Sequence, residues 1–424
     1  MSSIIIEKAY RTHALYTLDK RAMLYFQDGL RTSIRRAIWV SKSAGKMKTI
    51  ALSGQMTTLH PHGDASEVVQ NFTSCFKNNQ PYFDGNDAGF GTLIDPDNYS
   101  APRYSSLKQA DFTKDVILVD THIVPMTNNY DDTCQEPLYL LPLIPLHFIN
   151  PITGMAIGYK CSTLPYKLSD IISTQLLCLD NQPLNSLVPY FEPLQQTGVL
   201  HNTTAKNNNT WTFTGTVNQI SKYKWQITKL PYGVVHDKFI KHMHALYEDG
   251  FITNIEDSSS AAINCTITLS KTFAENLKIE VLLKKLKLTC IQSECLYFID
   301  IETKTVQQYT VLELIQKFTI WRLGFFKIRI EYRNKELFLK KSFDEALLKA
   351  IEYIDSTKYN ITLATRQQFK TDLMSCGIVE HIDTIINLPI YRFNKDEADK
   401  LKEQIKKTEQ QITYNIKIIN SDKM

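Results

Sequence analysis

The 424-residue sequence lacks the short motifs that mark most nucleotide-dependent and metal-dependent enzymes. It contains no glycine-rich phosphate loop of the Walker type, no dinucleotide-binding fingerprint and no paired His-Glu metal motif. Its eight cysteines are scattered, without a Cys-x-x-Cys pair or a Cys/His group at zinc spacing. Aspartates such as Asp95, Asp97, Asp131 and Asp132 lie in contexts typical of turns. We therefore expect reduced thiols and no complete metal site in this chain.

The net charge is also small, and long apolar runs are few. The net charge is only +4, so any nucleic-acid surface must be a local feature. The first 24 residues have charges spread through them and do not resemble a signal peptide. Residues 137–159 lack Asp, Glu, Lys and Arg, but four prolines argue against a membrane-spanning helix and favour buried strands and turns. We expect no membrane association and a cytoplasmic location, which for a viral protein is the host cytoplasm.

A local basic region follows the N-terminus. Apolar residues at turn spacing predict two helices within residues 9–50, separated by a turn at Asp28 and Gly29. Residues 21–50 contain seven Lys or Arg and one acid. Charge alone leaves two interpretations open, a solvated helix face and a nucleic-acid surface.

Residues 53–130 are rich in Gly, Asn, Asp and Ser and contain the motifs "LHPHGD" and "FDGNDAGFGT". In the first motif His60 and His62 flank a proline, Gly63 permits a tight backbone, and Asp64 is suited to cap a following helix. Such a histidine pair is often structural, but near a phosphate an imidazole can donate a hydrogen bond to a non-bridging oxygen.

The remaining sequence predicts an α/β module and two long helices. β-rich runs surround a helical segment within residues 185–310. Residues 310–355 read as one long helix, and a second follows residue 394. In the second helix Leu401, Ile405, Thr408 and Ile412 recur at four-three-four spacing, which predicts an antiparallel, coiled-coil-like pairing of the two.

The order of these motifs is more specific than any one of them. The chain reads Arg21, then Asp-Gly-Leu-Arg with Arg35 and Arg36, then "HPHGD", then "DGNDAGFG", then Arg103 and Tyr104. "NYDDTCQEP", "ITKLPY" and "INLPIYRFNKDEADKLKEQI" follow later. This order resembles the breakage-reunion subunit of type IIA DNA topoisomerases, the gyrase A and topoisomerase IV family, and especially the short medium subunit of T-even phages.

The resemblance implies a multidomain α+β fold. Residues 1–147 would form a winged-helix breakage-reunion domain with the catalytic tyrosine. Residues 148–309 would form an α/β tower domain. Residues 310–424 would form a long antiparallel coiled-coil stalk with a C-terminal dimer gate.

The resemblance also implies a mechanism. Tyr104 would attack a DNA phosphorus to leave a 5′-phosphotyrosyl link, although a tyrosine hydroxyl with a pKa near ~10 needs activation by its neighbours. Arg103, His62 and Arg21 would stabilise charge on the phosphate oxygens. Asp28 and Gly29 would shape a turn, with Asp28 orienting that turn or Arg21, and Gly63 would have a structural role. The DNA-binding residues would be Arg31, Arg35, Arg36, Lys42, His60 and Met155, the last as a wedge in a base step.

By the same resemblance the chain acts with partners. Two tyrosines require a two-fold dimer on double-stranded DNA. Mg²⁺ and ATP would both be bound by toprim and ATPase subunits of the gyrase B type. Because the sequence stops after the second long helix, relaxation and decatenation are expected rather than negative supercoiling.

Two other functions remain open at this point. One is an architectural DNA-binding protein that keeps the scaffold without cleaving DNA. The other is a tyrosine recombinase or single-strand topoisomerase, which the closeness of "LHPHGD" to "PRY" and the late paired helices disfavour.

Overall fold

The computed structural model describes residues 2–61, 63–85, 89–156, 158–203, 209–274, 278–359 and 364–420. It is a mixed α+β fold, as the sequence predicted. The chain divides into two compact units, Met1–Arg322 and Leu323–Met424. The expected boundary at residue 147 therefore lies inside the first unit.

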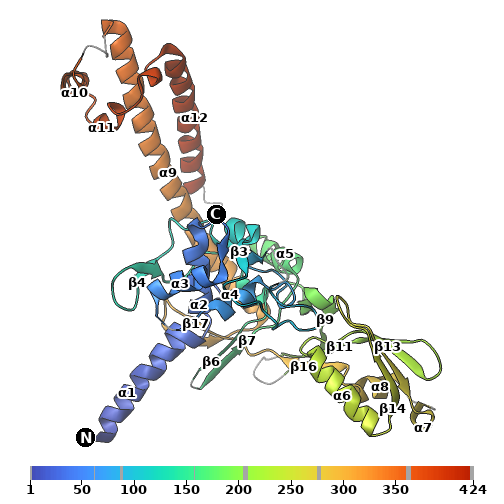
Figure 1. Ribbon diagram of the computed structural model, residues 1–424. Coiled ribbons are helices and arrows are strands. Elements are labelled where there is room, and N and C mark those ends of the chain that lie inside the picture. Colours follow the sequence, from blue (N-terminus) through green and yellow to red (C-terminus); the bar gives the residue numbers. More distant parts are fainter. Residues whose placement is uncertain are drawn as a thin grey trace. The chain divides into compact units, whose positions relative to one another are not determined.

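The first unit begins with helices and a small sheet (Figure 1). The helical segments are α1 (Ser2–Thr17), the π-helix η1 (Leu18–Ala22), α2 (Thr32–Val40), the 3-10 helix η2 (Ser41–Ser43), α3 (Thr49–Leu59) and α4 (Ser66–Thr73). The antiparallel sheet has the order β1-β3-β2, from strands β1 (Met47–Lys48), β2 (Phe83–Gly85) and β3 (Ser106–Gln109). Ile34 and Ile38 of α2 and Leu52 and Met56 of α3 are buried at helical spacing, which packs these helices together.

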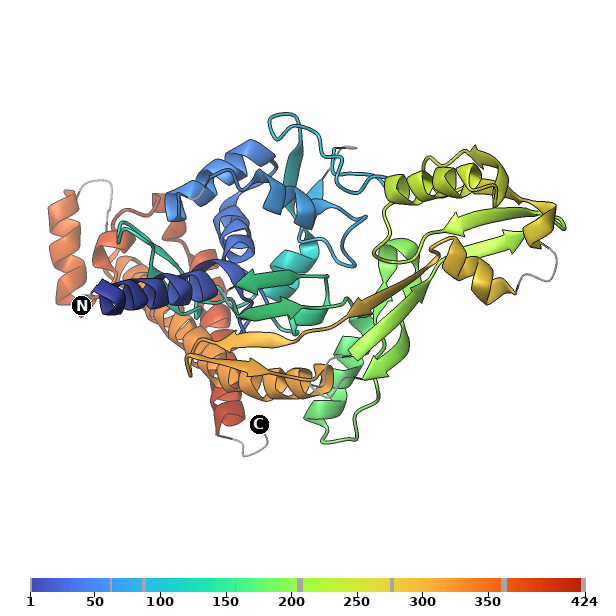
Figure 2. The ribbon, with the colours of Figure 1, turned by 90° about the horizontal axis from the view of Figure 1, so that it is seen from below.

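The proline-rich stretch that follows contains hairpins and buried turns. The elements are the π-helix η3 (Thr113–Ile117), β4 (Met126–Asn128), β5 (Gln135–Pro137), the 3-10 helix η4 (Leu146–Phe148), β6 (Thr153–Ala156), β7 (Tyr159–Ser162), α5 (Leu168–Leu179), β8 (Tyr190–Phe191), the 3-10 helix η5 (Glu192–Leu194) and β9 (Gln196–Thr197). β6 and β7 form an antiparallel hairpin that stands out in Figure 1 and whose two strands lie side by side in Figure 2. Leu140, Leu141, Leu146 and Phe148 are fully buried, so the uncharged stretch is interior chain. Among the described residues no helix is long and apolar enough to cross a membrane.

A second group of sheets forms one end of the first unit, with α6 covering it (Figure 1). Two antiparallel sheets have the orders β10-β11-β16 and β12-β13-β15-β14. Their strands are β10 (Val199–Thr203), β11 (Asn209–Thr214), β12 (Thr216–Gln219), β13 (Lys224–Lys229), β14 (Ile252–Asp257), β15 (Cys265–Leu269) and β16 (Thr289–Ser293). The helices are α6 (His236–Glu248), α7 (Lys271–Ala274) and α8 (Ile279–Lys285).

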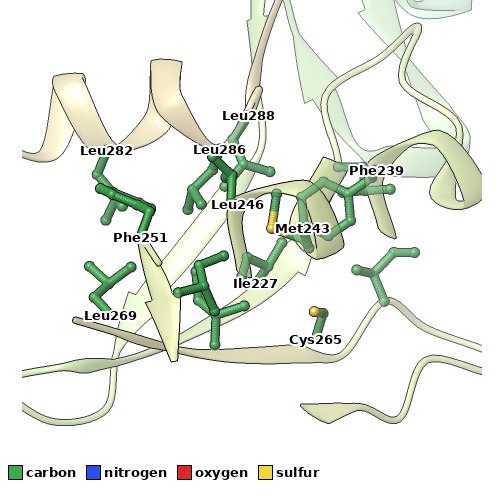
Figure 3. Close-up of a cluster of buried hydrophobic side chains, with 14 residues drawn as sticks. Ile227, Phe239, Met243, Leu246, Phe251, Cys265, Leu269, Leu282, Leu286 and Leu288 are labelled. Carbon is green, nitrogen blue, oxygen red and sulfur yellow. The ribbon is translucent and has the colours of Figure 1, made fainter. Parts of the chain in front are cut away.

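The core of this group joins one helix stripe to one strand face (Figure 3). On α6, Phe239, Met243 and Leu246 are buried at four-three spacing. On β15, Cys265 and Leu269 point into the same cluster, since alternate residues of a strand share a face. The sequence pattern of this α/β module therefore fixes its interior directly.

The chain then enters the long helix α9 (Val311–Thr357) through the hairpin of β17 (Tyr297–Asp300) and β18 (Thr305–Gln308). The second unit adds α10 (Arg366–Ser375), α11 (Ile382–Ile385), the 3-10 helix η6 (Ile390–Arg392) and α12 (Lys395–Ile419). Leu401, Thr408, Ile412 and Asn415 of α12 are buried.

The later part of α9 and α12 pair antiparallel. Asn334 of α9 accepts a hydrogen bond from Asn415 at 2.7 Å. Further along α9, Lys341 pairs with Glu409 at 2.8 Å and Glu352 with Lys402 at 3.3 Å. Position numbers rise along one helix as they fall along the other, so the two helices run in opposite directions.

Candidate functional site

Tyr104 lies on an exposed loop that precedes β3. Its backbone N–H donates to the carbonyl oxygen of Ala101 at 2.8 Å, which closes a tight turn. The side chain is 65% exposed, so the ring does not serve to fill the protein core. The Arg103 guanidinium carbon lies 4.8 Å from the centre of the Tyr104 ring. The loop thus presents a phenol and a cation together to solvent.

The start of α3 holds this loop in place. Backbone N–H groups of Thr49 and Ile50 donate to the carbonyl oxygens of Ser105 and Pro102 at 3.1 and 3.2 Å. The Thr49 and Ser105 hydroxyls lie 2.7 Å apart. These N–H groups have no partner inside the helix, so the tyrosine loop uses donors that a helix start leaves open.

Two longer side chains also anchor the loop, and the sequence did not identify either of them. The Lys48 Nζ donates to the carbonyl oxygen of Tyr104 at 2.9 Å. The Gln70 amide, on α4, donates to the carbonyl oxygen of Ser100 at 2.7 Å. Lys48 is 56 positions from Tyr104, and no local pattern links residues so far apart. Only the pairing of β1 with β3 brings them together.

Arg21 and His60 belong to a second group of side chains. The Tyr16 hydroxyl lies 2.9 Å from the Nε2 atom of His60. The Arg21 guanidinium carbon lies 5.4 Å from the Tyr16 ring centre, and the His60 and Tyr130 rings are 5.6 Å apart. Tyr16 and Tyr130 were not among the expected residues.

Helix α3 separates the two groups. The Tyr104 loop contacts Thr49, the first residue of α3, and His60 follows the last residue of α3. Eleven residues of α-helix span about 16 Å. One chain therefore does not bring Arg21 and His60 into contact with Tyr104.

The segment between His60 and α4 is only partly described. His62, which was expected to donate a hydrogen bond to a phosphate oxygen, lies outside the described residues. Gly63 has a left-handed φ of +69°, which favours glycine there. Asp64 accepts hydrogen bonds from the Ser66 hydroxyl at 2.6 Å and the Ser53 hydroxyl at 2.7 Å, and these bonds lower the pKa of the Asp64 carboxyl. Asp64 also accepts from the Ser66 backbone N–H, so it orders the start of α4.

The expected DNA contacts of Arg35 and Arg36 are wrong for this structure. Arg35 is 2% exposed, and its Nε atom lies 2.6 Å from the Asp28 carboxylate. Burial alone would lower the pKa of Arg35, but the Asp28 charge and hydrogen bonds outweigh it and raise that pKa. Arg36 is buried against Glu136, with an Nη2 to Oε1 distance of 2.7 Å. The face of α2 that carries both residues points into the protein.

Asp28 therefore orients Arg35 and not Arg21. It also accepts hydrogen bonds from the backbone N–H groups of Leu30 and Leu140, both at 3.0 Å. The first of these bonds orders the turn at Gly29, as expected. Gly29 has a φ of +67°, and a Cβ there would come within 2.6 Å of the His147 backbone nitrogen. Only glycine fits this turn.

The other two expected basic residues differ in exposure. Lys42 is exposed, with its Nζ atom 3.3 Å from the Trp39 ring centre, and desolvation lowers its pKa. Arg31, at the N-terminus of α2, is half-buried, and burial lowers its pKa. It lines a cavity described below.

Met155 lies on the β6–β7 hairpin and is 68% exposed. Its neighbour Gly154 is buried against η1, where a Cβ would come within 2.1 Å of the carbonyl oxygen of Ala22. The hairpin is thus seated closely on the backbone next to Arg21, and it presents an apolar side chain to solvent.

The described residues contain no cluster of side chains suited to bind a metal ion. No group of three or more His, Cys, Asp and Glu residues there has the geometry to hold a metal ion.

The site thus combines a phenol and an arginine on an anchored loop with an exposed methionine on a hairpin. Groups of the first kind can bind and attack a phosphate ester. The family of the A subunits of DNA gyrase and topoisomerase IV matches residues 21–424, and the chain belongs to this family.

Individual relatives cover nearly all of the chain. It is 26% identical to the A subunit of DNA topoisomerase 4 of Mycoplasma pneumoniae over 95% of its length, and 23% identical to the DNA topoisomerase medium subunit of Enterobacteria phage T4 over 97%. It covers 54% of the bacterial protein and 94% of the phage protein. The chain thus spans about half the length of the bacterial relatives it matches.

A solved structure has the same fold. The Plasmodium falciparum topoisomerase II DNA-binding, cleavage and re-ligation domain superposes with a TM-score of 0.85 at 20% identity, over 94% of this chain and 60% of that one. The family predicted from the order of the motifs is confirmed.

Proposed function

We propose that this chain is the DNA-cleaving subunit of an ATP-dependent type II DNA topoisomerase. It makes a transient double-strand break, passes a second duplex and rejoins the ends. The observation that carries the proposal is Tyr104, exposed beside Arg103 on a loop that α3 holds by backbone hydrogen bonds. Family membership and the names of the relatives support it.

In the cleavage step the Tyr104 oxygen attacks a DNA phosphorus. The new O–P bond forms as the bond from phosphorus to the 3′ oxygen breaks. The phenol gives up its proton, and the departing 3′ oxygen gains one. Because one ester replaces another, rejoining is the reverse step and needs no added energy source.

Cationic and hydrogen-bonding groups would stabilise the charge that builds on the phosphate oxygens. Arg103 stands beside the nucleophile, and Arg21 and His62 are the further proposed donors. Lys48 is a positioning residue, since its hydrogen bond fixes the carbonyl oxygen of Tyr104.

The DNA contacts differ from those expected at the outset. Lys42 and His60 remain proposed contacts, and Met155 remains the proposed wedge because it is exposed on a hairpin. Arg35 and Arg36 are not proposed as DNA contacts, because they are buried and paired with carboxylates. For Arg31 a DNA contact is the alternative to a second role, because this residue lines a cavity.

We assign the parts of the chain as the resemblance implied. Residues 1–147 serve as a winged-helix cleavage domain and residues 148–309 as a tower domain. Residues 310–424 serve as a coiled-coil stalk with a dimer gate, for which the antiparallel pair of α9 and α12 provides support.

The active assembly contains a second copy of the chain. The two groups of site residues lie at opposite ends of α3, so we propose that Arg21 and His60 of one protomer serve Tyr104 of its partner. Mg²⁺ and ATP are proposed to be bound by toprim and ATPase subunits of the gyrase B type. When bound, Mg²⁺ would supply electrophilic stabilisation of the phosphate.

The test is to trap a covalent DNA adduct on the chain mixed with gyrase B-like partners, duplex DNA and Mg²⁺. Tyr104→Phe should form no adduct while binding DNA like the unmodified chain. Tyr391→Phe, at another exposed tyrosine, serves as the control and should form the adduct normally. An adduct that persists in Tyr104→Phe would refute the proposal.

A further inference from the structure

A cavity of about 370 Å³ lies inside the first unit. Its walls come from the end of α4 and the turn after it, from the base of the β6–β7 hairpin, and from the loop that leads into α6. Its volume falls within the range of small-molecule sites. Among the described site residues, only Arg31 lines it.

Most of the cavity wall is apolar. Phe72 and Phe76 contribute from α4 and the turn after it, and Val234 and Ile263 from the opposite side. Leu93, also in the wall, packs against the buried cluster of Figure 3 together with Val234. Part of the wall is thus continuous with a buried hydrophobic core.

The cavity wall also contains one charged side chain, that of Arg31, which forms no ion pair with a described acidic residue. Arg31 is half-buried, and its Nε atom is buried without a hydrogen-bond partner among the described residues. Lys77, the other basic residue of the wall, has partners for its charge. It forms an ion pair with Asp97 and donates a hydrogen bond to the Asn71 side chain at 2.7 Å. Removing this N–H group from water without an acceptor is unfavourable, and an anion bound by the guanidinium would offset that cost.

We propose that this cavity binds a small, flat, mainly apolar molecule with one acidic group. The acidic group, a carboxylate or a sulfonate, would accept paired hydrogen bonds from the Arg31 guanidinium. The aromatic and aliphatic wall would cover the rest of the ligand. A DNA phosphate shares the charge but lacks the apolar body that this wall fits.

Such a ligand would contact three parts of the first unit at once. Its binding free energy would oppose any movement among α4, the hairpin that carries Met155 and the loop before α6. This consequence for DNA handling rests on the proposed function, whereas ligand binding itself does not.

The test compares two fluorescent probes that differ by one charge, anilinonaphthalene sulfonate and the neutral phenylnaphthylamine. The full chain should bind one sulfonate probe saturably, about tenfold more tightly than the neutral probe. Arg31→Met should remove that preference and leave binding of the neutral probe unchanged. Arg11→Met, at an exposed arginine on α1, is the matched control and should change neither affinity.

Two filling variants, Val234→Trp and Ile263→Trp, should weaken both probes about tenfold while the far-ultraviolet circular dichroism stays native. Two variants from separate segments keep the test decisive if one fails to fold. Equal affinities for the two probes, or a charge preference that survives Arg31→Met, would overturn the proposal. Competitive displacement of the sulfonate probe by duplex DNA would also overturn it and assign Arg31 to the DNA path. Tyr104→Phe should bind both probes normally, so failure of cleavage and failure of this site are distinguishable.

Discussion

Arginines in the N-terminal region differ sharply in their exposure to solvent. Arg35 and Arg36 are buried in ion pairs, whereas Arg103 is exposed beside the proposed nucleophile. A buried guanidinium is tolerated only when a carboxylate compensates the loss of water, and Glu136, which does so for Arg36, is 100 positions away. Spacing along α2 therefore did not reveal which arginines are buried.

Lys48 offers a test of positioning at the residue scale. Lys48→Met removes the hydrogen bond to the Tyr104 carbonyl oxygen, so the rate of adduct formation at saturating DNA should fall about tenfold. Lys48→Arg should recover part of that rate. Lys46→Met, two residues away and also exposed, should keep the rate of the unmodified chain. An undiminished rate in Lys48→Met would show that the bond does not position the nucleophile.

His147 offers a test of pH dependence. Its ring is fully buried and its Nε2–H donates to the carbonyl oxygen of Tyr25, and burial lowers its pKa from 6.5 to about 4. The unfolded chain therefore binds the proton more tightly than the folded one. The contribution of His147 to the unfolding free energy is complete above pH 6.5, declines as the pH falls toward 4, and is constant below that.

The whole shift corresponds to about 3 kcal/mol. Urea unfolding at pH 7 and pH 4 measures it as a difference between variants. His147→Gln should lose about 3 kcal/mol less over this interval than the unmodified chain. The exposed His244→Gln should show the full loss. Identical pH dependence in His147→Gln and the unmodified chain would contradict the lowered pKa.

At the scale of elements, close backbone contact positions the β6–β7 hairpin. Gly154 lies against the carbonyl oxygen of Ala22 at the end of η1, and the hairpin exposes Met155 one residue later. No side chain fits between these two segments. A glycine in a strand often marks such an approach, although the sequence does not say what approaches.

Gly154→Ala should disrupt this close backbone contact. Because the new Cβ would lie 2.1 Å from a backbone oxygen, the hairpin must shift, and the unfolding free energy should fall by about 1–3 kcal/mol. Gly54→Ala is the matched control on α3, where nothing lies within 4 Å. It should raise stability by about 1 kcal/mol through helix propensity. Urea unfolding of both variants gives the comparison, and an unchanged midpoint for Gly154→Ala would rule out the close contact.

At the scale of the whole molecule, the site is divided between the ends of α3. Tyr104 and Arg103 lie near its start, and Arg21 and His60 near its end. Arg21 is exposed, so it is accessible to a second copy. The proposed dimer thus completes a site that one chain leaves in two pieces.

Mixed dimers test this division. A dimer of one Tyr104→Phe chain with one Arg21→Ala chain keeps a single tyrosine, on the chain that lacks Arg21. If the groups act across the dimer, that tyrosine meets an intact Arg21, and the mixture should nick one DNA strand. Dimers of Arg21→Ala alone should show about a hundredfold lower cleavage. Nicking no greater than in those dimers would mean that each chain serves its own tyrosine.

The sequence by itself determined the family, the α+β class, the presence of the α/β module and the long helices. These depend on motif order and on apolar spacing along the chain, as with Phe239, Met243 and Leu246 on α6. The tertiary structure alone decided that Arg35 and Arg36 are buried, that Lys48 holds the Tyr104 loop and that Arg31 lines a cavity. Burial, ion pairing and strand pairing join residues distant in sequence, and no local pattern records which distant groups will meet.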